Sequence, residues 1–152
     1  MYNAGMKWIV AILTGMMLTW NAVADRVADL RPVIHEAAAV YGVDPVMMEA
    51  IIRLESGHAT SKAARSKNNL AGIMGRRGQR RYASKEDCVR DLARILGKYK
   101  AKGRVTVAQV SRTYCARSVR GKWISKVTSF MGEIRRGRWG AMPAPVQPKN
   151  NP

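Results

Sequence analysis

The stretch Ala50-Ile51-Ile52-Arg53-Leu54-Glu55-Ser56-Gly57-His58 determines how the rest of the chain is interpreted. Its apolar residues are typical of the last turns of a buried helix. The Ser-Gly pair directly after the carboxylate predicts that the helix ends there, because glycine is common just past a helix C-terminus. Glu55 therefore falls at a helix end, where the partial negative charge of the backbone carbonyls disfavours another negative charge.

Two interpretations of Glu55 are open from this stretch alone. The residue is either a solvated helix-end side chain or a partly buried carboxyl group. In the second case, burial and the helix end both raise its pKa. A carboxyl group that keeps its proton near neutral pH is what a general acid requires.

The chain has the length of one domain and an unusual charge. It has 152 residues, of which 47% are hydrophobic and 24% charged, as in ordinary globular proteins. The 27 Lys and Arg residues exceed the 10 Asp and Glu residues, which gives a formal net charge of +17. Such a surface favours polyanionic partners, namely nucleic acid, anionic lipid or an anionic cell-wall polymer.

The N-terminus indicates where the protein acts. Lys7 precedes an apolar run over residues 8–20, and Ala22-Val23-Ala24 follows, which is the pattern of a secretory signal peptide. We predict a signal peptide over residues 1–24 and export to the periplasm or the cell exterior. An uncleaved anchor is the alternative, although the run is short for a membrane span. We therefore expect an envelope polyanion as partner, no nucleic acid, and transient membrane contact through the signal peptide only.

The cysteines and histidines suggest no metal site. Cys88 and Cys115 are the only cysteines, and in an exported chain one pair allows one disulfide. Two separate buried thiols are the alternative to this predicted disulfide. His35 and His58 stand alone, so no metal and no cofactor are expected.

Five segments have apolar residues at helical spacing. Asp44, Ser84 and Thr106 are the predicted N-caps of three of them. Within the second, Glu49 and Arg53 lie four residues apart and are expected to form a surface ion pair. The predicted helices cover residues 29–41, 45–55, 85–99, 107–115 and 122–134.

The region between the second and third predicted helices differs in composition. Residues 58–83 lack helical periodicity, and a basic turn at residues 75–81 separates short segments, which predicts a loop and hairpin lobe. The arginines of this turn either face a substrate or are solvated. Residues 140–152 contain four prolines and no periodicity, and we predict a disordered tail there.

The acids near this lobe limit the possible chemistry. No Asp or Glu lies between Ser56 and Lys85, whereas ordinary glycosidases pair two carboxylates across the scissile bond. A glycosidase that uses Glu55 would need its nucleophile from the substrate, either a 2-acetamido group or the 6-hydroxyl of an N-acetylmuramyl unit. The hydroxyl of Tyr82 or Tyr114 is a further assisting group, and for each tyrosine a packed aromatic role is the alternative.

Several motifs occur in a characteristic order. Leu54-Glu55-Ser56-Gly57 comes first, then Ser61, then Asn69-Leu70-Ala71-Gly72-Ile73-Met74, then Tyr82-Ala83-Ser84 before a helix, and Tyr114-Cys115-Ala116 fits a last motif loosely. This order resembles the glucosaminidase domain of glycoside hydrolase family 73, which includes flagellar-rod hydrolases and many autolysins. The resemblance covers about residues 33–135. His58-Ala59, Ala71 and Met74 depart from the family pattern of Trp-Gly, an aromatic residue and lysine.

The resemblance implies a mainly α, lysozyme-like (α+β) fold, with one domain over residues 25–139, and cleavage of peptidoglycan glycan strands. It implies that Glu55 is the general acid and that Tyr114 supplies an assisting hydroxyl. It places Asn69 and Gly72 in the wall of the sugar groove. Ser56, Ser61 and Tyr82 are the remaining candidates for substrate binding.

The predicted function is therefore that of an exported peptidoglycan hydrolase of the endo-β-N-acetylglucosaminidase type. A lytic transglycosylase, a muramidase and a non-catalytic, basic wall-binding protein are the alternatives. We expect a monomer whose partner is the peptidoglycan glycan strand. An envelope-spanning apparatus is a further partner that the sequence leaves open.

Overall fold

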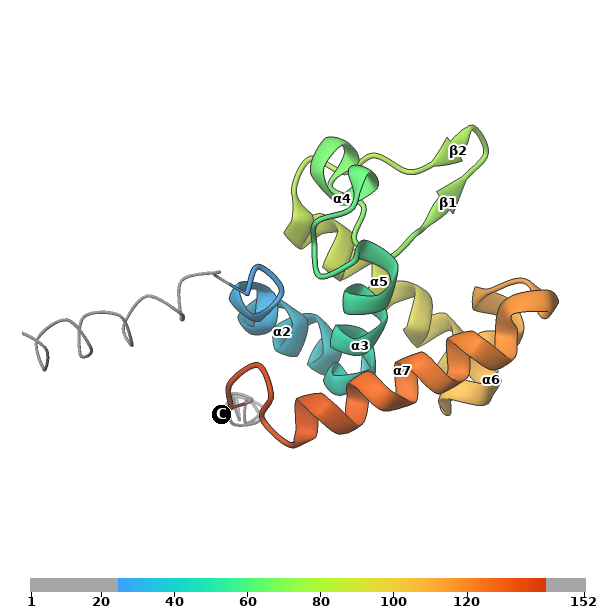
Figure 1. Ribbon diagram of the computed structural model, residues 1–152. Helices are drawn as coiled ribbons and strands as arrows, with labels where there is room; N and C mark the ends of the chain where they lie inside the picture. Colours follow the sequence, from blue (N-terminus) through green and yellow to red (C-terminus); the bar gives the residue numbers. More distant parts are fainter. Residues whose placement is uncertain (1–24, 142–152) are drawn as a thin grey trace, which may run out of the picture.

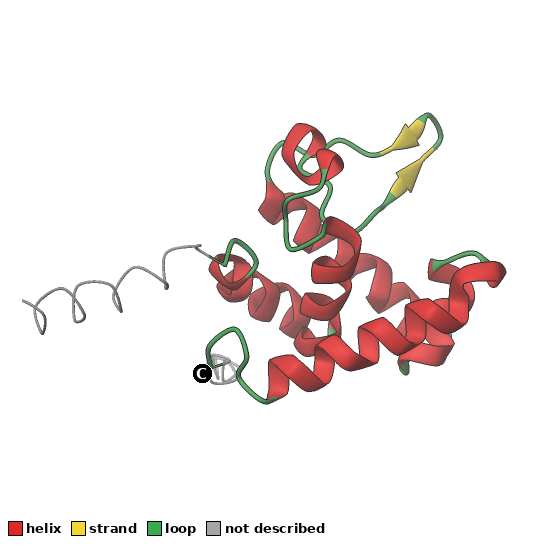
Figure 2. Cartoon of the chain, in the orientation of Figure 1, coloured by secondary structure: helices red, strands yellow, loops and turns green. Residues whose placement is uncertain are grey.

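The computed structural model describes residues 25–141. The predicted signal peptide over residues 1–24 lies outside the described residues, as do residues 142–152 of the predicted tail. The described part is helical apart from one small antiparallel sheet (Figures 1 and 2), which confirms the mainly α, lysozyme-like fold class. Its elements are η2 (Ala28–Leu30), α2 (Arg31–Tyr41), α3 (Pro45–Ser56), α4 (Lys62–Lys67), β1 (Met74–Gly75), β2 (Gly78–Gln79), α5 (Lys85–Lys100), α6 (Val107–Tyr114), η3 (Arg117–Val119) and α7 (Arg120–Arg135).

Helix α3 is the buried centre of the fold. The Asp44 side chain caps its start by accepting a hydrogen bond from the Val46 N–H at 2.8 Å, and Pro45 occupies the first turn. Gly57 ends it in the left-handed conformation, with φ of 54°. Both ends are those expected from the sequence. Figure 1 shows α3 between α2 and α7, and α3 packs against both.

The other long helices enclose α3. Helix α5 packs on α2, and α6 packs on α7. Ser84 and Thr106 cap α5 and α6 as predicted, and Gln109 completes a capping box with Thr106. The fully buried aliphatic side chains that join these helices are Ile34, Met48, Ile51, Ile52, Leu70, Val89, Leu92 and Val127.

The expectation of a surface pair between Glu49 and Arg53 is wrong, because both side chains are buried. Glu49 is 0% exposed and accepts hydrogen bonds from Arg31 Nη2 at 2.9 Å and from Arg53 Nη2 at 2.7 Å. Arg53 also donates to Asp25 at 2.7 Å. Helical spacing predicted the pair. The burial of Glu49 and Arg53 is favourable because Arg31 of α2 also pairs with Glu49, since a buried charge needs partners.

The same ionic network fixes the end of the described chain. Arg31 Nη1 donates to the carbonyl oxygens of Trp139 and Gly140, at 2.9 and 3.1 Å. Gly140 and Ala141, the first residues of the predicted tail, are therefore attached to the N-terminal end of α2. The ionic network thus joins both ends of the described chain to α3.

The lobe between α3 and α5 contains the predicted hairpin and an unpredicted helix. β1 and β2 pair antiparallel, with Met74 opposite Gln79. Helix α4 was missed because it has only six residues, is capped by Ser61 and buries only Ala64, so it shows no apolar periodicity. Figure 1 shows α4 and the hairpin together on one side of α3, with α7 on the other.

The predicted disulfide is not formed in the structure. Cys88 is a buried free thiol that accepts a hydrogen bond from the Leu70 N–H at 3.2 Å, and burial raises its pKa to about 11. Cys115 is a half-buried free thiol that donates to the Ser111 carbonyl at 3.4 Å. The two sulfur atoms therefore have separate backbone partners.

Among residues 25–141, no helix is both long and apolar enough to cross a membrane.

Candidate active site

Glu55 lies one residue before the C-terminal end of α3 and is half-buried. The backbone after it has three successive residues with positive φ, namely Gly57 at 54°, His58 at 56° and Ala59 at 66°. This tight reversal turns the chain away from the helix axis directly after the carboxylate. Burial raises the pKa of Glu55, and the hydrogen bond from Trp123 opposes that rise.

Trp123 of α7 holds one oxygen of the carboxyl group. Its indole N–H donates to Glu55 Oε1 at 2.7 Å. Trp123 is only 6% exposed, so the ring is fixed in the α3–α7 interface. With Oε1 engaged as an acceptor, the proton of the neutral carboxyl group is placed on Oε2.

Gly72 lies against that second oxygen. A Cβ atom at Gly72 would be 2.9 Å from Glu55 Oε2, and the residue has φ of 63°. Both the close approach and the left-handed backbone require glycine here. Any side chain at this position of the loop between α4 and β1 would therefore crowd Oε2.

Tyr114, at the end of α6, completes this side of the site. Its hydroxyl donates to the carbonyl oxygen of Ala71, next to Gly72. Its ring lies beside the Trp123 ring, with centroids 5.3 Å apart. Burial, reinforced by the nearby Glu55 carboxylate, raises the pKa of Tyr114 well above its ordinary value, so the hydroxyl is neutral.

These residues line a single groove of about 380 Å³. The exposed Lys122 and Lys126 flank Trp123 on α7, so the groove has a basic wall. A second hollow of about 320 Å³ shares Gly72 and Tyr114 with it and extends toward Met74 on β1. The lining residues of the groove are Leu54, Glu55, Gly72, Tyr114, Cys115, Val119, Lys122, Trp123 and Lys126.

Two predicted substrate-binding serines have partners within the fold. Ser56 is fully buried, donates to the Ile52 carbonyl at 2.5 Å and accepts from the Ala59 N–H at 2.8 Å. The Ser61 hydroxyl caps α4 by accepting from the Ala64 N–H at 3.2 Å. Neither residue lines the groove.

Asn69 and Tyr82 also have structural partners. Asn69 is 1% exposed, and its amide group donates to the Ile73 and Arg80 carbonyls at 2.8 and 3.0 Å, which shapes the loop that presents Gly72. The Tyr82 hydroxyl donates to Asp91 at 2.7 Å, and burial raises its pKa. Arg80 pairs with the same carboxylate at 2.8 Å, so this tyrosine and arginine attach the lobe to α5.

Glu55 is the only carboxylate that lines the groove. Two other acids, Glu49 and Asp91, are held by arginines. Within residues 25–141, no three His, Cys, Asp or Glu side chains are placed to hold a metal ion. The arrangement can donate a proton from Oε2, but it offers no second carboxylate to act as a nucleophile.

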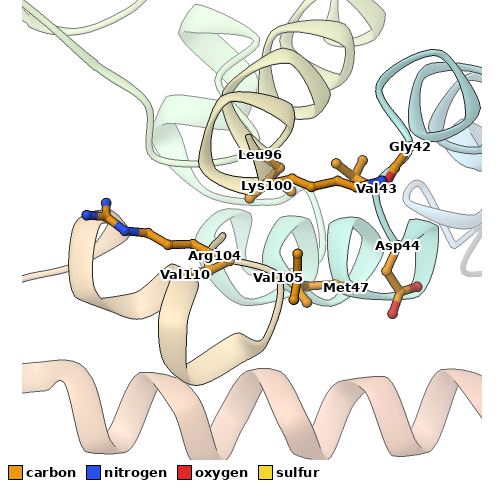
Figure 3. Close-up of a pocket in the computed structure, with 9 residues that line it drawn as sticks. All are labelled: Gly42, Val43, Asp44, Met47, Leu96, Lys100, Arg104, Val105 and Val110. Carbon is orange, nitrogen blue, oxygen red and sulfur yellow. The ribbon is translucent and has the colours of Figure 1, made fainter. Parts of the chain in front are cut away.

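A separate cavity lies at the other end of α3 (Figure 3). It has a volume of about 290 Å³, and its walls are mainly aliphatic, including Val43, Met47 and Val110. Figure 3 shows the Asp44 carboxylate directed away from Lys100 and Arg104. Met47 is eight residues before Glu55, about 12 Å along the helix, so this cavity is not part of the groove.

The sequence did not identify Trp123, Lys122 and Lys126 as groove residues. Trp123 falls on the apolar face of α7, where the sequence pattern does not distinguish a groove residue from a core residue. The lysines belong to a chain with 27 basic residues, in which single positions do not stand out. Their roles follow only from the packing of α7 on α3.

Comparison with known proteins gives one family match. The model of the glucosaminidase family, described as mannosyl-glycoprotein endo-beta-N-acetylglucosaminidase, matches residues 31–136. The match covers 106 of the 152 residues and includes every groove residue. Searches of characterised proteins and of solved structures gave no match.

Proposed function

The chain belongs to the glucosaminidase family of glycoside hydrolases that act on peptidoglycan, and from this premise we propose that it is exported and cleaves the β-1,4 bond after N-acetylglucosamine, with Glu55 as general acid. The observation that carries the proposal is the environment of Glu55. Its carboxyl group is half-buried, has a raised pKa, and faces Gly72 with its free oxygen. The apolar N-terminal run supports export.

The first chemical step is proton donation. Trp123 occupies Oε1, so Glu55 donates the proton from Oε2 to the glycosidic oxygen as the bond to C1 breaks. A carboxyl group with a raised pKa is protonated in a larger fraction of molecules near neutral pH, which suits this role. The absence of a side chain at Gly72 leaves space for the leaving sugar.

The nucleophile comes from the substrate. Since Glu55 is the only carboxylate of the groove, the 2-acetamido oxygen of the N-acetylglucosamine unit attacks C1 and forms a cyclic oxazolinium intermediate. Water then opens this ring, and the Glu55 carboxylate takes the proton of that water. The proton count is restored after one cycle.

Tyr114 assists as a neutral hydroxyl group. Its high pKa excludes a phenolate at neutral pH, and its proton is directed at the Ala71 carbonyl. The tyrosine therefore holds the Ala71–Gly72 backbone at the carboxyl group. We expect Tyr114→Phe to lose less activity than a change at Glu55.

Product analysis tests the bond specificity. Purified sacculi are digested, and the soluble fragments are analysed by mass spectrometry after reduction. N-acetylglucosamine at the reducing end supports the proposal. Anhydromuramyl ends would instead assign a lytic transglycosylase, in which the 6-hydroxyl is the nucleophile, and muramic acid reducing ends would assign a muramidase. Binding to sacculi without release of fragments would indicate a non-catalytic wall-binding protein.

A further inference from the structure

A second polar cavity lies beyond the groove, and its residues have no role in the chemistry described above. It has a volume of about 550 Å³. We call it the arginine pocket, because four of its eight lining residues are arginines. The lining residues are Asp25, Arg26, Arg53, His58, Thr60, Arg65, Arg138 and Trp139.

Two of these arginines have no ionic partner among the described residues 25–141. Arg53 is neutralised by Glu49 and Asp25, and Arg138 pairs with Glu133 at 2.6 Å. Arg26 and Arg65 are exposed, and neither forms a salt bridge within residues 25–141. The pocket therefore presents two guanidinium groups to a ligand.

The back wall of the pocket is rigidly held. The Trp139 ring stacks on the Arg53 guanidinium group, with the Arg53 Cζ atom 4.0 Å from the ring centroid, and Arg31 anchors its backbone carbonyl at 2.9 Å. His58 packs against Trp139 and Phe130, with ring centroids 5.5 and 5.4 Å away. Little conformational freedom remains to be lost in this wall when a ligand binds.

The arginine pocket lies next to the groove along α7 and the end of α3. On α7, Lys126 lines the groove, and Phe130, one turn further along, contacts two pocket residues. On the facing side, Leu54 and Glu55 line the groove and His58 lines the pocket. Trp123 and Phe130 are seven residues apart, about 10 Å along the helix, so the pocket lies beside the path of a strand that passes Glu55.

We propose that the arginine pocket binds the carboxylate groups of the peptide stems carried by the glycan strand. The inference rests on the proposed function, since it names a further part of the same substrate. In a stem-bearing strand the N-acetylated sugars are neutral, because the lactyl carboxyl group of each muramic acid is in amide linkage to its stem, whereas each stem ends in carboxylates. A guanidinium group binds a carboxylate through two parallel hydrogen bonds, which an ammonium group does not provide.

The test compares strands with and without stems. The substrates are soluble glycan strands and the same strands after an amidase has removed the stems, which leaves one lactyl carboxylate on each muramic acid and none at the distance of a stem end. The variant Arg26→Gln/Arg65→Gln removes the two guanidinium groups without a salt bridge, and both residues are exposed. The matched control Lys98→Gln/Lys102→Gln removes the same charge from exposed positions in the last turn of α5 and two residues beyond it, outside the pocket.

We expect the arginine variant to raise KM for stem-bearing strands about tenfold, which corresponds to about 1.4 kcal/mol, and to leave kcat unchanged. For stemless strands, we expect the KM of the arginine variant to stay at the wild-type value. For the lysine control, we expect both kcat and KM to stay at the wild-type values. An equal effect on both substrates, an equal effect of the control, or no effect would overturn the proposal. If the difference in KM disappeared only after phosphate polymers were removed from the strands, those polymers and not the stems would be the ligand, and the proposal would also be overturned.

A binding measurement separates this inference from the proposed function. Soluble glycan strands with and without stems are titrated with Glu55→Gln, and with Glu55→Gln carrying both arginine substitutions. We expect the arginine substitutions to weaken binding about tenfold on stem-bearing strands only. Equal binding by the two proteins overturns the inference, whereas wild-type protein that binds and releases no fragments overturns the proposed function alone.

Discussion

The contact between Gly72 and Glu55 predicts the effect of a single methyl group. In Gly72→Ala, the new Cβ atom would lie 2.9 Å from Glu55 Oε2, where ordinary contacts begin at 3.4 Å. The carboxyl group must move by about 0.5 Å to relieve this contact. It is held by the Trp123 hydrogen bond of 2.7 Å, so the movement weakens that bond or displaces the proton that is donated.

Two separate effects follow from this substitution. A displacement of this size at a reacting group lowers kcat by about 10- to 100-fold. An alanine at φ of 63° also strains the backbone, which lowers the free energy of unfolding by about 1 kcal/mol, or about 4 °C in Tm for a domain of this size.

Gly103→Ala is the matched control. Gly103 has φ of 73°, and an added Cβ atom would meet nothing within 4 Å. The control therefore shares the backbone strain without the contact to Glu55, and we expect a similar loss of Tm with unchanged kcat. The assay is the rate of release of soluble fragments from sacculi, with Tm measured by circular dichroism. Equal kcat in the two variants would refute the assigned geometry of the carboxyl group.

Three further predictions concern the surroundings of this site. Trp123→Phe removes the hydrogen bond that lowers the pKa of Glu55, so we expect the alkaline limb of the pH–rate profile to move to higher pH. If this limb did not move, Glu55 would not be the acid that titrates there. Glu49→Gln leaves the buried guanidinium groups of Arg31 and Arg53 without their shared carboxylate, so we expect the free energy of unfolding, measured in urea, to fall by about 3 kcal/mol. The control Glu86→Gln changes an exposed residue and is expected to alter that free energy by less than about 0.5 kcal/mol. The two cysteines are free, so we expect the denatured protein to titrate two thiols without reductant, and fewer would show a disulfide.

The sequence predicted most helix ends because the signals there are local. Pro45 and Gly57 bound α3, and Ser84 and Thr106 cap α5 and α6, as short-range rules require. The last helix begins two residues earlier than expected, at Arg120, after a 3-10 turn that has no apolar pattern.

Long-range contacts account for what the sequence did not predict. The ion pair of Glu49 and Arg53 is buried because Arg31 and Asp25 reach it from distant positions in the chain. The partnership of Trp123 with Glu55 spans 68 residues. No spacing rule covers such distances, since they depend on how α7 packs on α3.

The candidate site was predictable only in part, because its contacts also join residues that are far apart in the chain. The position of Glu55 before Ser-Gly pointed to an acid at a helix end, and the structure adds its burial and its contacts with Trp123 and Gly72. Polar residues of the same motifs have other roles. Asn69 shapes the loop that presents Gly72, and Ser56 closes the end of α3. A motif residue that has an internal hydrogen-bond partner can therefore support a site without contacting the substrate.

The activity of Glu55→Gln tests the central claim most directly. Glutamine keeps the shape of the side chain and can still accept the Trp123 hydrogen bond, but its amide N–H is not acidic enough to protonate the glycosidic oxygen. The measurement is kcat/KM for release of fragments from sacculi, with Tm as the control for folding. We predict a loss of about 10²- to 10⁴-fold with the fold intact. A folded Glu55→Gln protein with activity within a few-fold of the wild type would contradict the claim that Glu55 is the general acid.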